Sequence, residues 1–261
     1  MVNFISLSSG SNGNCYYFTN GSISFLIDLG IGIRTAKKRL SEAGLSIESV
    51  NFLLVTHDHF DHIMSVGTYT QRYSRPVYTT ERIHQALRRN FCTTGRIGAF
   101  ARVLKEDETE QICGVSVTPF EVPHDATQTV GYHIVFDGVR ITVMTDLGDV
   151  TDAAVRYASD CDRLIVESNF DVDMLLSGPY PKQLKERILQ GHGHLSNDQT
   201  SQLLKCLVHK DLKGIYLCHL SANNNTPQIA YESAKKTLGS IGSQAFLYCL
   251  PRSSASELFT F

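Results

Sequence analysis

The stretch Thr56-His57-Asp58-His59-Phe60-Asp61-His62 directly follows a short continuous apolar run, Phe52–Thr56. Such a run is typical of a strand buried on both faces. The first two histidines of the stretch are two residues apart, so in extended backbone they project to the same side. The second aspartate and the last histidine are expected on the turn that enters the next helix. Imidazole and carboxylate groups are ligands that Zn²⁺, Mn²⁺ and Fe²⁺ accept, so the spacing predicts a site for two metal ions. The candidate ligands in this stretch are His57, His59, Asp61 and His62.

The composition excludes several classes of protein. The chain has 261 residues, 42% hydrophobic and 19% charged, which is long enough for a sizeable core and unlike a disordered chain. Its 24 basic and 26 acidic residues exclude a strong global field for nucleic acid but not a local basic patch. No apolar run approaches the roughly 20 residues of a membrane span, and the first residues lack the pattern of a signal peptide. The seven cysteines are scattered without a C-x-x-C pair, which suits thiols in a reducing compartment. The sequence therefore predicts a cytoplasmic protein with no membrane partner.

The pattern of apolar residues predicts an α+β fold in a single domain, residues 1–261. No repeat, charge block or low-complexity linker divides the chain. Two successive blocks, each rich in strands and then helical, indicate two sheets packed face to face with helices outside, an αββα four-layer sandwich. The expected strands are 2–7, Cys15–Thr19, Ser22–Asp28, Phe52–Thr56, Val77–Tyr78, Gly114–Val122, Thr129–Phe136, Arg140–Thr145, Arg163–Glu167, Ile215–Cys218 and Gln244–Tyr248. The expected helices are Arg34–Ala43, Thr80–Asn90, Thr151–Ala158, Pro181–Leu189, Asn197–Val208 and Gln228–Leu238.

The H-x-H-x-D-H pattern of residues 57–62 resembles the signature of the metallo-β-lactamase fold superfamily, and further motifs follow the order of that superfamily. These motifs are Leu26-Ile27-Asp28-Leu29-Gly30, Val122-Pro123-His124-Asp125, Val143-Met144-Thr145-Asp146-Leu147-Gly148 and Tyr216-Leu217-Cys218-His219-Leu220-Ser221. The resemblance spans residues 24–221 and implies the metallo-β-lactamase fold.

The resemblance also implies a set of ligands for two divalent metal ions, zinc or manganese. The first ion would take His57, His59, His124 and Asp146, and the second would take Asp61, His62, Asp146 and His219. Asp146 has two oxygens and would bridge the ions, with a water or hydroxide bridging them on the open side. Asp28 would support the ligand loop by hydrogen bonds rather than bind metal, as residues behind histidine ligands do.

Several segments resemble the YycJ (WalJ) branch of the superfamily and its phosphodiesterase relatives. They are Ser8–Asn14, Glu167-Ser168-Asn169, Tyr180-Pro181, Gly193-His194-Leu195-Ser196-Asn197 and His219-Leu220-Ser221. Members of this branch are described as 5′-to-3′ exonucleases acting on DNA. The resemblance therefore implies a phosphodiesterase that cleaves nucleic acid or a small phosphodiester, with a metal-bridging hydroxide as the nucleophile.

Two other functions stay open at this point. The same hydroxide could attack carbon in a carbonyl substrate such as a thioester or lactone. A non-catalytic module on a decayed hydrolase fold is the third reading, and the intact ligand positions argue against it.

Some residues beyond the ligand set are candidates for catalysis or phosphate binding. His194 is an imidazole just before an expected helix N-terminus, so it could protonate the leaving 3′-oxygen or simply cap or pack there. Asp61 counts as a catalytic candidate as well as a ligand. Ser9, Ser11 and Asn12 could present hydroxyls and backbone N–H groups to a phosphate, or form a tight hairpin loop. Ser196 could donate to a phosphate or cap the helix.

Residues 70–102 are rich in arginine, which could neutralise the phosphates of a nucleic acid or form a solvated face. The arginines are Arg72, Arg75, Arg82, Arg88, Arg89, Arg96 and Arg102, and Tyr69, Tyr73, Tyr78 and Phe91 lie among them. Aromatic side chains in such a setting can stack on bases, although core packing is the commoner fate. An arginine-lined face would also suit a homodimer, so the sequence leaves the oligomeric state open.

Overall fold

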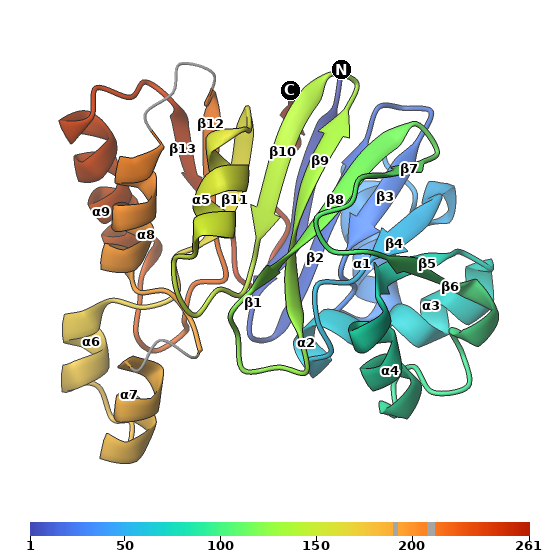
Figure 1. The fold of residues 1–261 in the computed structure, drawn as a ribbon, viewed down its shortest axis with the longest axis horizontal. Helices are drawn as coiled ribbons and strands as arrows, with labels where there is room; N and C mark the ends of the chain where they lie inside the picture. The colour runs from blue at the N-terminus through green and yellow to red at the C-terminus, as the bar shows by residue number, and fades with distance from the viewer. Residues whose placement is uncertain (190–192, 208–211) are drawn as a thin grey trace.

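The computed structural model describes residues 1–189, 193–207 and 212–261, which form two sheets packed face to face with helices on the outside (Figure 1). The strand order of the first sheet is β14-β1-β2-β3-β4-β5-β6, and that of the second is β13-β12-β11-β10-β9-β8-β7. None of the helices in the described ranges is long and apolar enough to cross a bilayer.

The first half of the chain builds the first sheet and the helices beside it. Its strands are β1 (Asn3–Gly10), β2 (Gly13–Thr19), β3 (Ser24–Ile27), β4 (Phe52–Leu54), β5 (Val77–Thr80) and β6 (Ala101–Leu104), with β14 (Phe259–Thr260) added from the C-terminus. Its helices are α1 (Ile33–Glu42), α2 (Phe60–Ile63), α3 (Val66–Tyr73) and α4 (Glu81–Arg89), with short 3₁₀ helices at Ile47–Ser49 and Gly98–Phe100. Strands β1 to β3 pair antiparallel and β3 to β6 pair parallel.

The second half of the chain builds the second sheet. Its strands are β7 (Glu110–Ile112), β8 (Val115–Val122), β9 (Thr129–Phe136), β10 (Val139–Met144), β11 (Arg163–Glu167), β12 (Gly214–Cys218) and β13 (Phe246–Cys249). Its helices are α5 (Asp152–Ser159), α6 (Val172–Ser177), α7 (Lys182–Leu189), α8 (Asn197–Cys206) and α9 (Pro227–Ser240). Strands β10 to β13 run parallel, so their carboxyl ends lie at one edge of the sheet.

A row of phenylalanines fills the space between the two sheets. Phe4, Phe18, Phe25 and Phe52 stack on one another across β1 to β4, with ring centroids 4.8–5.1 Å apart. Phe136 of the second sheet meets the edge of this row at 5.6 Å. Full burial of one such side chain contributes about 1.5–3 kcal/mol, so the row holds the two sheets firmly against each other. The strand ends that carry the polar motifs are thereby fixed in space.

Most of the predicted elements are present, with differences at the weakest ones. Strands β9 and β11 have the predicted bounds, whereas β4 is shorter than predicted. Asp61 and His62 lie inside the short helix α2 rather than on the turn before it. The sequence predicted none of β6, β7, β14, α3 and α6, which are short elements stabilised by tertiary packing. Val208, the last residue of one predicted helix, lies outside the described residues.

Gly30 allows the loop after β3 to touch the metal-motif helix α2. A Cβ at this position would lie 1.6 Å from the carbonyl oxygen of Asp61. We expect Gly30→Ala to lower the free energy of unfolding by about 3 kcal/mol or more, because backbone atoms have to move apart. Gly239→Ala is the matched control: this glycine lies in α9 with open space around it, so the change is expected to be neutral or stabilising. Urea denaturation measures both, and equal losses in the two variants would contradict the explanation.

Candidate metal centre

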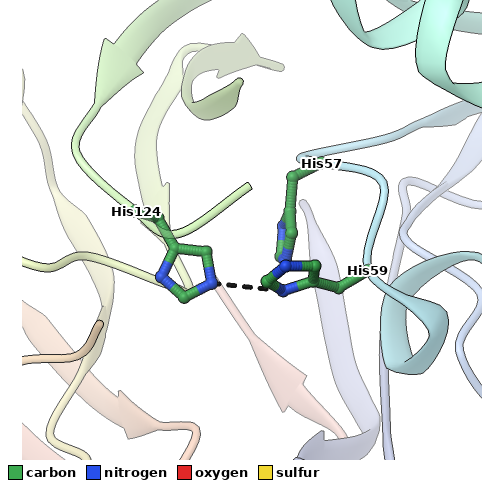
Figure 2. Close-up of side chains that lie close together, drawn as sticks. All are labelled: His57, His59 and His124. Atoms are coloured by element: carbon green, nitrogen blue, oxygen red, sulfur yellow. Dashed lines mark hydrogen bonds between the residues drawn. The ribbon is translucent and has the colours of Figure 1, made fainter. Parts of the chain in front are cut away.

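Three histidines point toward one another where β4 and β8 end (Figure 2). His57 and His59 come from the loop after β4 and His124 from the loop after β8. Their ring centroids are 4.6–5.1 Å apart, and one nitrogen from each ring lies within 4.8 Å of the other two. The three side chains therefore form a group that could hold one metal ion.

A second group lies beside the first, and Asp146 lies between them. Asp61 and His62 of α2 come together with His219, which follows β12. Asp146 follows β10, and its carboxylate is 3.2 Å from Nε2 of His62 and 3.6 Å from Nε2 of His124. Asp146 therefore faces ligand candidates of both groups, as a bridging carboxylate must.

Each histidine of the cluster has one ring nitrogen held by a neighbouring oxygen. His62 donates to Asp28 at 2.7 Å, His59 to the Asp125 carbonyl at 2.8 Å, His219 to Glu167 at 2.9 Å, His57 to the Thr56 hydroxyl at 3.0 Å, and His124 to the Gly193 carbonyl. These bonds fix the orientation of each ring and leave its other nitrogen facing the cluster.

The nitrogen and oxygen atoms that face the centre of the cluster are suited to binding a cation. Nδ1 of His59 and Nε2 of His124 lie 3.3 Å apart, and the hydrogen bonds above give each of them a lone pair rather than a proton (Figure 2). Nε2 of His57, Oδ2 of Asp146 and Nε2 of His219 are buried and have no hydrogen-bond partner among the described residues. Buried polar atoms without partners each cost about 1–3 kcal/mol. Divalent metal ions would satisfy all of these atoms at once.

The charges of the cluster divide the histidines into two kinds. Burial, reinforced by the nearby His62, lowers the pKa of His57 well below its usual range, so this ring is neutral. Burial also opposes a charge on His219, but Asp146, Asp61 and Glu167 outweigh it and raise the pKa of His219 to about 10. Before a metal ion binds, the cluster therefore holds protons that the ion has to displace.

Glu167 is a functional residue that the sequence analysis did not assign. It is fully buried at the end of β11, and its carboxylate accepts hydrogen bonds from His194 at 2.7 Å and from His219 at 2.9 Å. The backbone N–H groups of Leu147 and Leu195 hold its other oxygen. A carboxylate that ends an otherwise apolar predicted strand was the signal that could have identified it. Glu167 fixes His194 beside the cluster without itself facing the cavity.

A cavity of about 390 Å³ opens over the cluster. Its lining includes Ser11, His59, His124 and His194, and the segment from α6 to α7 supplies Tyr180 and Arg187. Arg187 forms an ion pair with Asp125, which ties α7 to the loop that carries His124. The cavity is therefore bounded by the cluster, by His194 and by the segment from α6 to α7.

The comparisons with known proteins agree with this architecture. The family model described as "Beta-lactamase superfamily domain" matches residues 24–217. The chain belongs to the beta-lactamase superfamily. Within this superfamily, it is 31% identical to "Exodeoxyribonuclease WalJ" of Streptococcus pneumoniae serotype 2 over 86% of this chain and 84% of that protein. It is also 31% identical to "Exodeoxyribonuclease YycJ" of Bacillus anthracis, over 91% of this chain and 89% of that protein.

A solved structure shows the same fold. Zn²⁺-bound PqqB from Methylobacterium extorquens superposes with a TM-score of 0.73 and 17% identity, over 98% of this chain and 99% of that protein. The predicted metallo-β-lactamase fold, an αββα sandwich, is therefore confirmed, and the fold implies divalent metal ions at the cluster.

The four residues suggested for phosphate binding separate into two pairs in this superfamily member. Ser11 lines the cavity and Asn12 is exposed beside it, on the turn between β1 and β2. Ser9 is buried, bonds to the Tyr16 hydroxyl and accepts from the backbone N–H of His219, so no substrate can reach it. Ser196 is also buried and caps α8 in a capping box with Gln199. Ser196 therefore has the capping role, one of the two roles that the sequence left open, and the burial of Ser9 argues against phosphate binding there.

Asp28 supports the metal motif of this superfamily member in the way the resemblance implied. Its carboxylate accepts from the Thr56 backbone N–H at 2.9 Å, the Thr56 hydroxyl at 2.8 Å and His62. Its backbone is left-handed (φ 58°), which costs a non-glycine residue about 1–3 kcal/mol and is typical of functional sites.

We expect Asp28→Asn to weaken metal affinity about 10- to 100-fold, because the amide no longer accepts from His62 and Thr56 together. Titration of the stripped protein with Zn²⁺ measures the change. Asp137→Asn is the matched control, since Asp137 also has a left-handed backbone (φ 48°) but lies between β9 and β10, joined by a hydrogen bond to Asn20. Unchanged Zn²⁺ affinity in Asp28→Asn would show that the position of His62 does not depend on the Asp28 carboxylate.

Proposed function

We propose that this protein is a metal-dependent phosphodiesterase with 5′-to-3′ exonuclease activity on nucleic acid. The observation that carries the proposal is the meeting, in one cavity, of the His/Asp cluster with a histidine that Glu167 holds from behind. The two relatives that match most of the chain are named exodeoxyribonucleases, which supports a nucleic-acid substrate. Hydrolysis of a thioester or lactone is not favoured, because neither relative's name indicates it.

The ligand set that we propose is the one that the resemblance implied. One ion would be held by His57, His59, His124 and Asp146, and the other by Asp61, His62, Asp146 and His219. This mixture of imidazole and carboxylate donors suits zinc and manganese, the two metals that we propose. When bound, the ions supply a water of lowered pKa and offset negative charge on the phosphoryl oxygens.

Three residues around the cluster are proposed to donate a proton or to contact the substrate: His194, Ser11 and Asn12. Burial opposes a charge on His194, but the Glu167 carboxylate outweighs it and raises the pKa of His194 above its usual value. The protonated form of His194 is therefore favoured, and because its Nδ1 is bound to Glu167, its Nε2–H is free to protonate the leaving 3′-oxygen. Ser11 lines the cavity and Asn12 is exposed on the same turn between β1 and β2, where we propose that they meet a substrate phosphate.

A comparison of substrates tests the proposal. The purified protein is assayed for bound metal, then for hydrolysis of bis-p-nitrophenyl phosphate and 5′-labelled DNA, with a thioester and nitrocefin as carbonyl substrates, with and without added Mn²⁺. We expect hydrolysis of the phosphodiesters and release of mononucleotides from the 5′ end. Hydrolysis of the carbonyl substrates alone would retain the metal centre and overturn the proposed function.

The cellular location stays a prediction. It rests on the cysteines, which are all free thiols, as expected in a reducing compartment. Expression of a tagged chain followed by fractionation of the cells would test the cytoplasmic assignment directly.

A further inference from the structure

Two exposed phenylalanines lie together at the edge of the metal motif. Phe60 stands between the ligand candidates His59 and Asp61, and its side chain is 50% exposed. Phe91, which follows α4, is 74% exposed, and its ring is nearly parallel to that of Phe60, with centroids 5.9 Å apart and planes 19° apart. Rings of this size usually serve the core, so two that stack on each other in solvent form an unusual surface. We call this pair the Phe60–Phe91 platform.

The loop that carries Phe91 is rigidly held. Asn90 accepts from the backbone N–H of Cys92, and the buried Thr93 hydroxyl donates to the Leu87 carbonyl. The loop also packs closely on α3, where a Cβ on Gly67 would lie 2.3 Å from the carbonyl oxygen of Cys92. Phe91 is therefore presented to solvent by a fixed backbone, and binding on its ring costs little ordering of the protein.

Arginines precede and follow Phe91 in the chain, at positions 88, 89 and 96. A cavity of about 390 Å³ is lined by Asn90, the residue before Phe91, with Arg82, Arg89 and Asp58, and one of about 520 Å³ is lined by Arg88 and Arg96. Arg82 is paired with Glu121 and Arg88 with Glu81. Within the described ranges, no carboxylate lies within ion-pair distance of Arg89 or Arg96. Arg96 donates to the Thr68 hydroxyl and the Cys92 carbonyl, so Arg89, two residues before Phe91, is the guanidinium group available to an anion.

We infer that the Phe60–Phe91 platform binds an unpaired base of a nucleic-acid strand whose scissile phosphate lies at the metal cluster, while Arg89 contacts the strand's backbone phosphate. The inference rests on the proposed function and names its substrate as single-stranded at this position. Aromatic faces beside positive charge are the means by which proteins hold single strands without reading their sequence. Both faces of a paired base are covered by its neighbours in the double helix, so a base within a continuous duplex cannot stack on the platform.

Substitutions of Phe91 test the stacking. Binding of the metal-loaded protein to a fluorescently labelled, phosphorothioate-linked oligothymidylate is followed by anisotropy. We expect Phe91→Ala to weaken binding about tenfold, and Phe91→Leu to weaken it similarly, because leucine restores apolar bulk without a π-face. Phe246→Ala is the matched control: Phe246 is also exposed, but it lies on β13 at the edge of the second sheet, so its removal is expected to leave affinity unchanged.

A tryptophan at the same place gives a direct signal. The chain contains no tryptophan, so Phe91→Trp introduces a single fluorophore on the platform. We expect it to keep the affinity of the unaltered chain and to be quenched by the single strand, but neither by an abasic strand nor by a continuous duplex. Arg89→Gln is expected to reduce the salt dependence of log affinity by about one unit of slope, whereas Lys236→Gln on α9 leaves the slope unchanged.

Several outcomes would overturn the inference. Unchanged strand affinity in Phe91→Ala, or full affinity in Phe91→Leu, would exclude stacking. If gel filtration shows a dimer that Phe91→Ala converts to a monomer while strand binding is unchanged, the platform is a contact between two copies of the chain.

Failure of the proposed function is a separate result. If the chain binds the strand through Phe91 but hydrolyses no phosphodiester, the inference about the platform holds and the proposed function is wrong. If the chain cleaves DNA but binds it independently of Phe91, the proposed function holds and the inference about the platform is wrong.

Discussion

Asp146→Ala is expected to lose bound metal and phosphodiester hydrolysis together. The carboxylate is 1% exposed and faces His62, His124 and His219, so it belongs to both halves of the cluster. Loss of a residue that merely supports a ligand costs about 10- to 100-fold in affinity or activity, and loss of a shared ligand should cost more. Elemental analysis and hydrolysis of bis-p-nitrophenyl phosphate measure the two effects on the same sample.

The matched control for this substitution is Asp149→Ala. Asp149 is an exposed aspartate on the same loop, and it contacts only the backbone of Val150 among the described residues. We expect it to keep its metal and its activity, with circular dichroism showing that both variants are folded. A full complement of metal in Asp146→Ala would refute the bridging role.

His194→Ala is expected to keep its metal and to slow the cleavage of DNA about 10²- to 10⁴-fold, the usual contribution of a general acid. The effect should depend on the leaving group. A sugar 3′-oxygen needs a proton as it departs, whereas p-nitrophenolate is stable without one, so hydrolysis of bis-p-nitrophenyl phosphate should fall much less. The ratio of the two rates, measured at equal metal content, separates proton donation from damage to the cluster.

Two further variants make the prediction about His194 sharper. Glu167→Gln should reproduce the dependence on the leaving group in weaker form, because the amide holds the ring of His194 without favouring its charge, and it should also weaken metal binding, because Glu167 holds His219 as well. His219→Ala should instead lose metal. Equal metal loss in His194→Ala and Asp146→Ala would show that His194 is a ligand and not an acid.

The sequence predicted those parts of the centre that depend on local spacing. The motif 57–62 was predicted from its own spacing after a buried strand, whereas the resemblance to the superfamily placed the later histidines and the aspartate with it. Glu167 acts on residues that lie 27 and 52 positions further along the chain. The pairing of β11 with β12 brings His219 to it, and the bridge between Phe170 and Ser196 brings His194. No local pattern carries that information.

The features that the sequence left open or did not indicate have the same cause. Ser9 lies in a run of serine, glycine and asparagine that suggests a phosphate loop, but pairing of β1 with β2 turns its hydroxyl inward to Tyr16. Strand β14 contains two residues and exists because β1 offers it an edge. Likewise, nothing in the sequence indicates that Phe91 meets Phe60, since the position of α4 decides it.

Because the ligands are divided between the two sheets, metal binding depends on the packing of one sheet against the other. Four proposed ligands come from the part of the chain that builds the first sheet and three from the part that builds the second: His57, His59, Asp61 and His62, then His124, Asp146 and His219. Neither half can hold the ions alone, so each tenfold rise in free metal above the dissociation constant adds about 1.4 kcal/mol to the docking of one half on the other. A partly folded or newly made chain would then lack nuclease activity until its halves join, and chelation would loosen the sandwich as it stops the reaction.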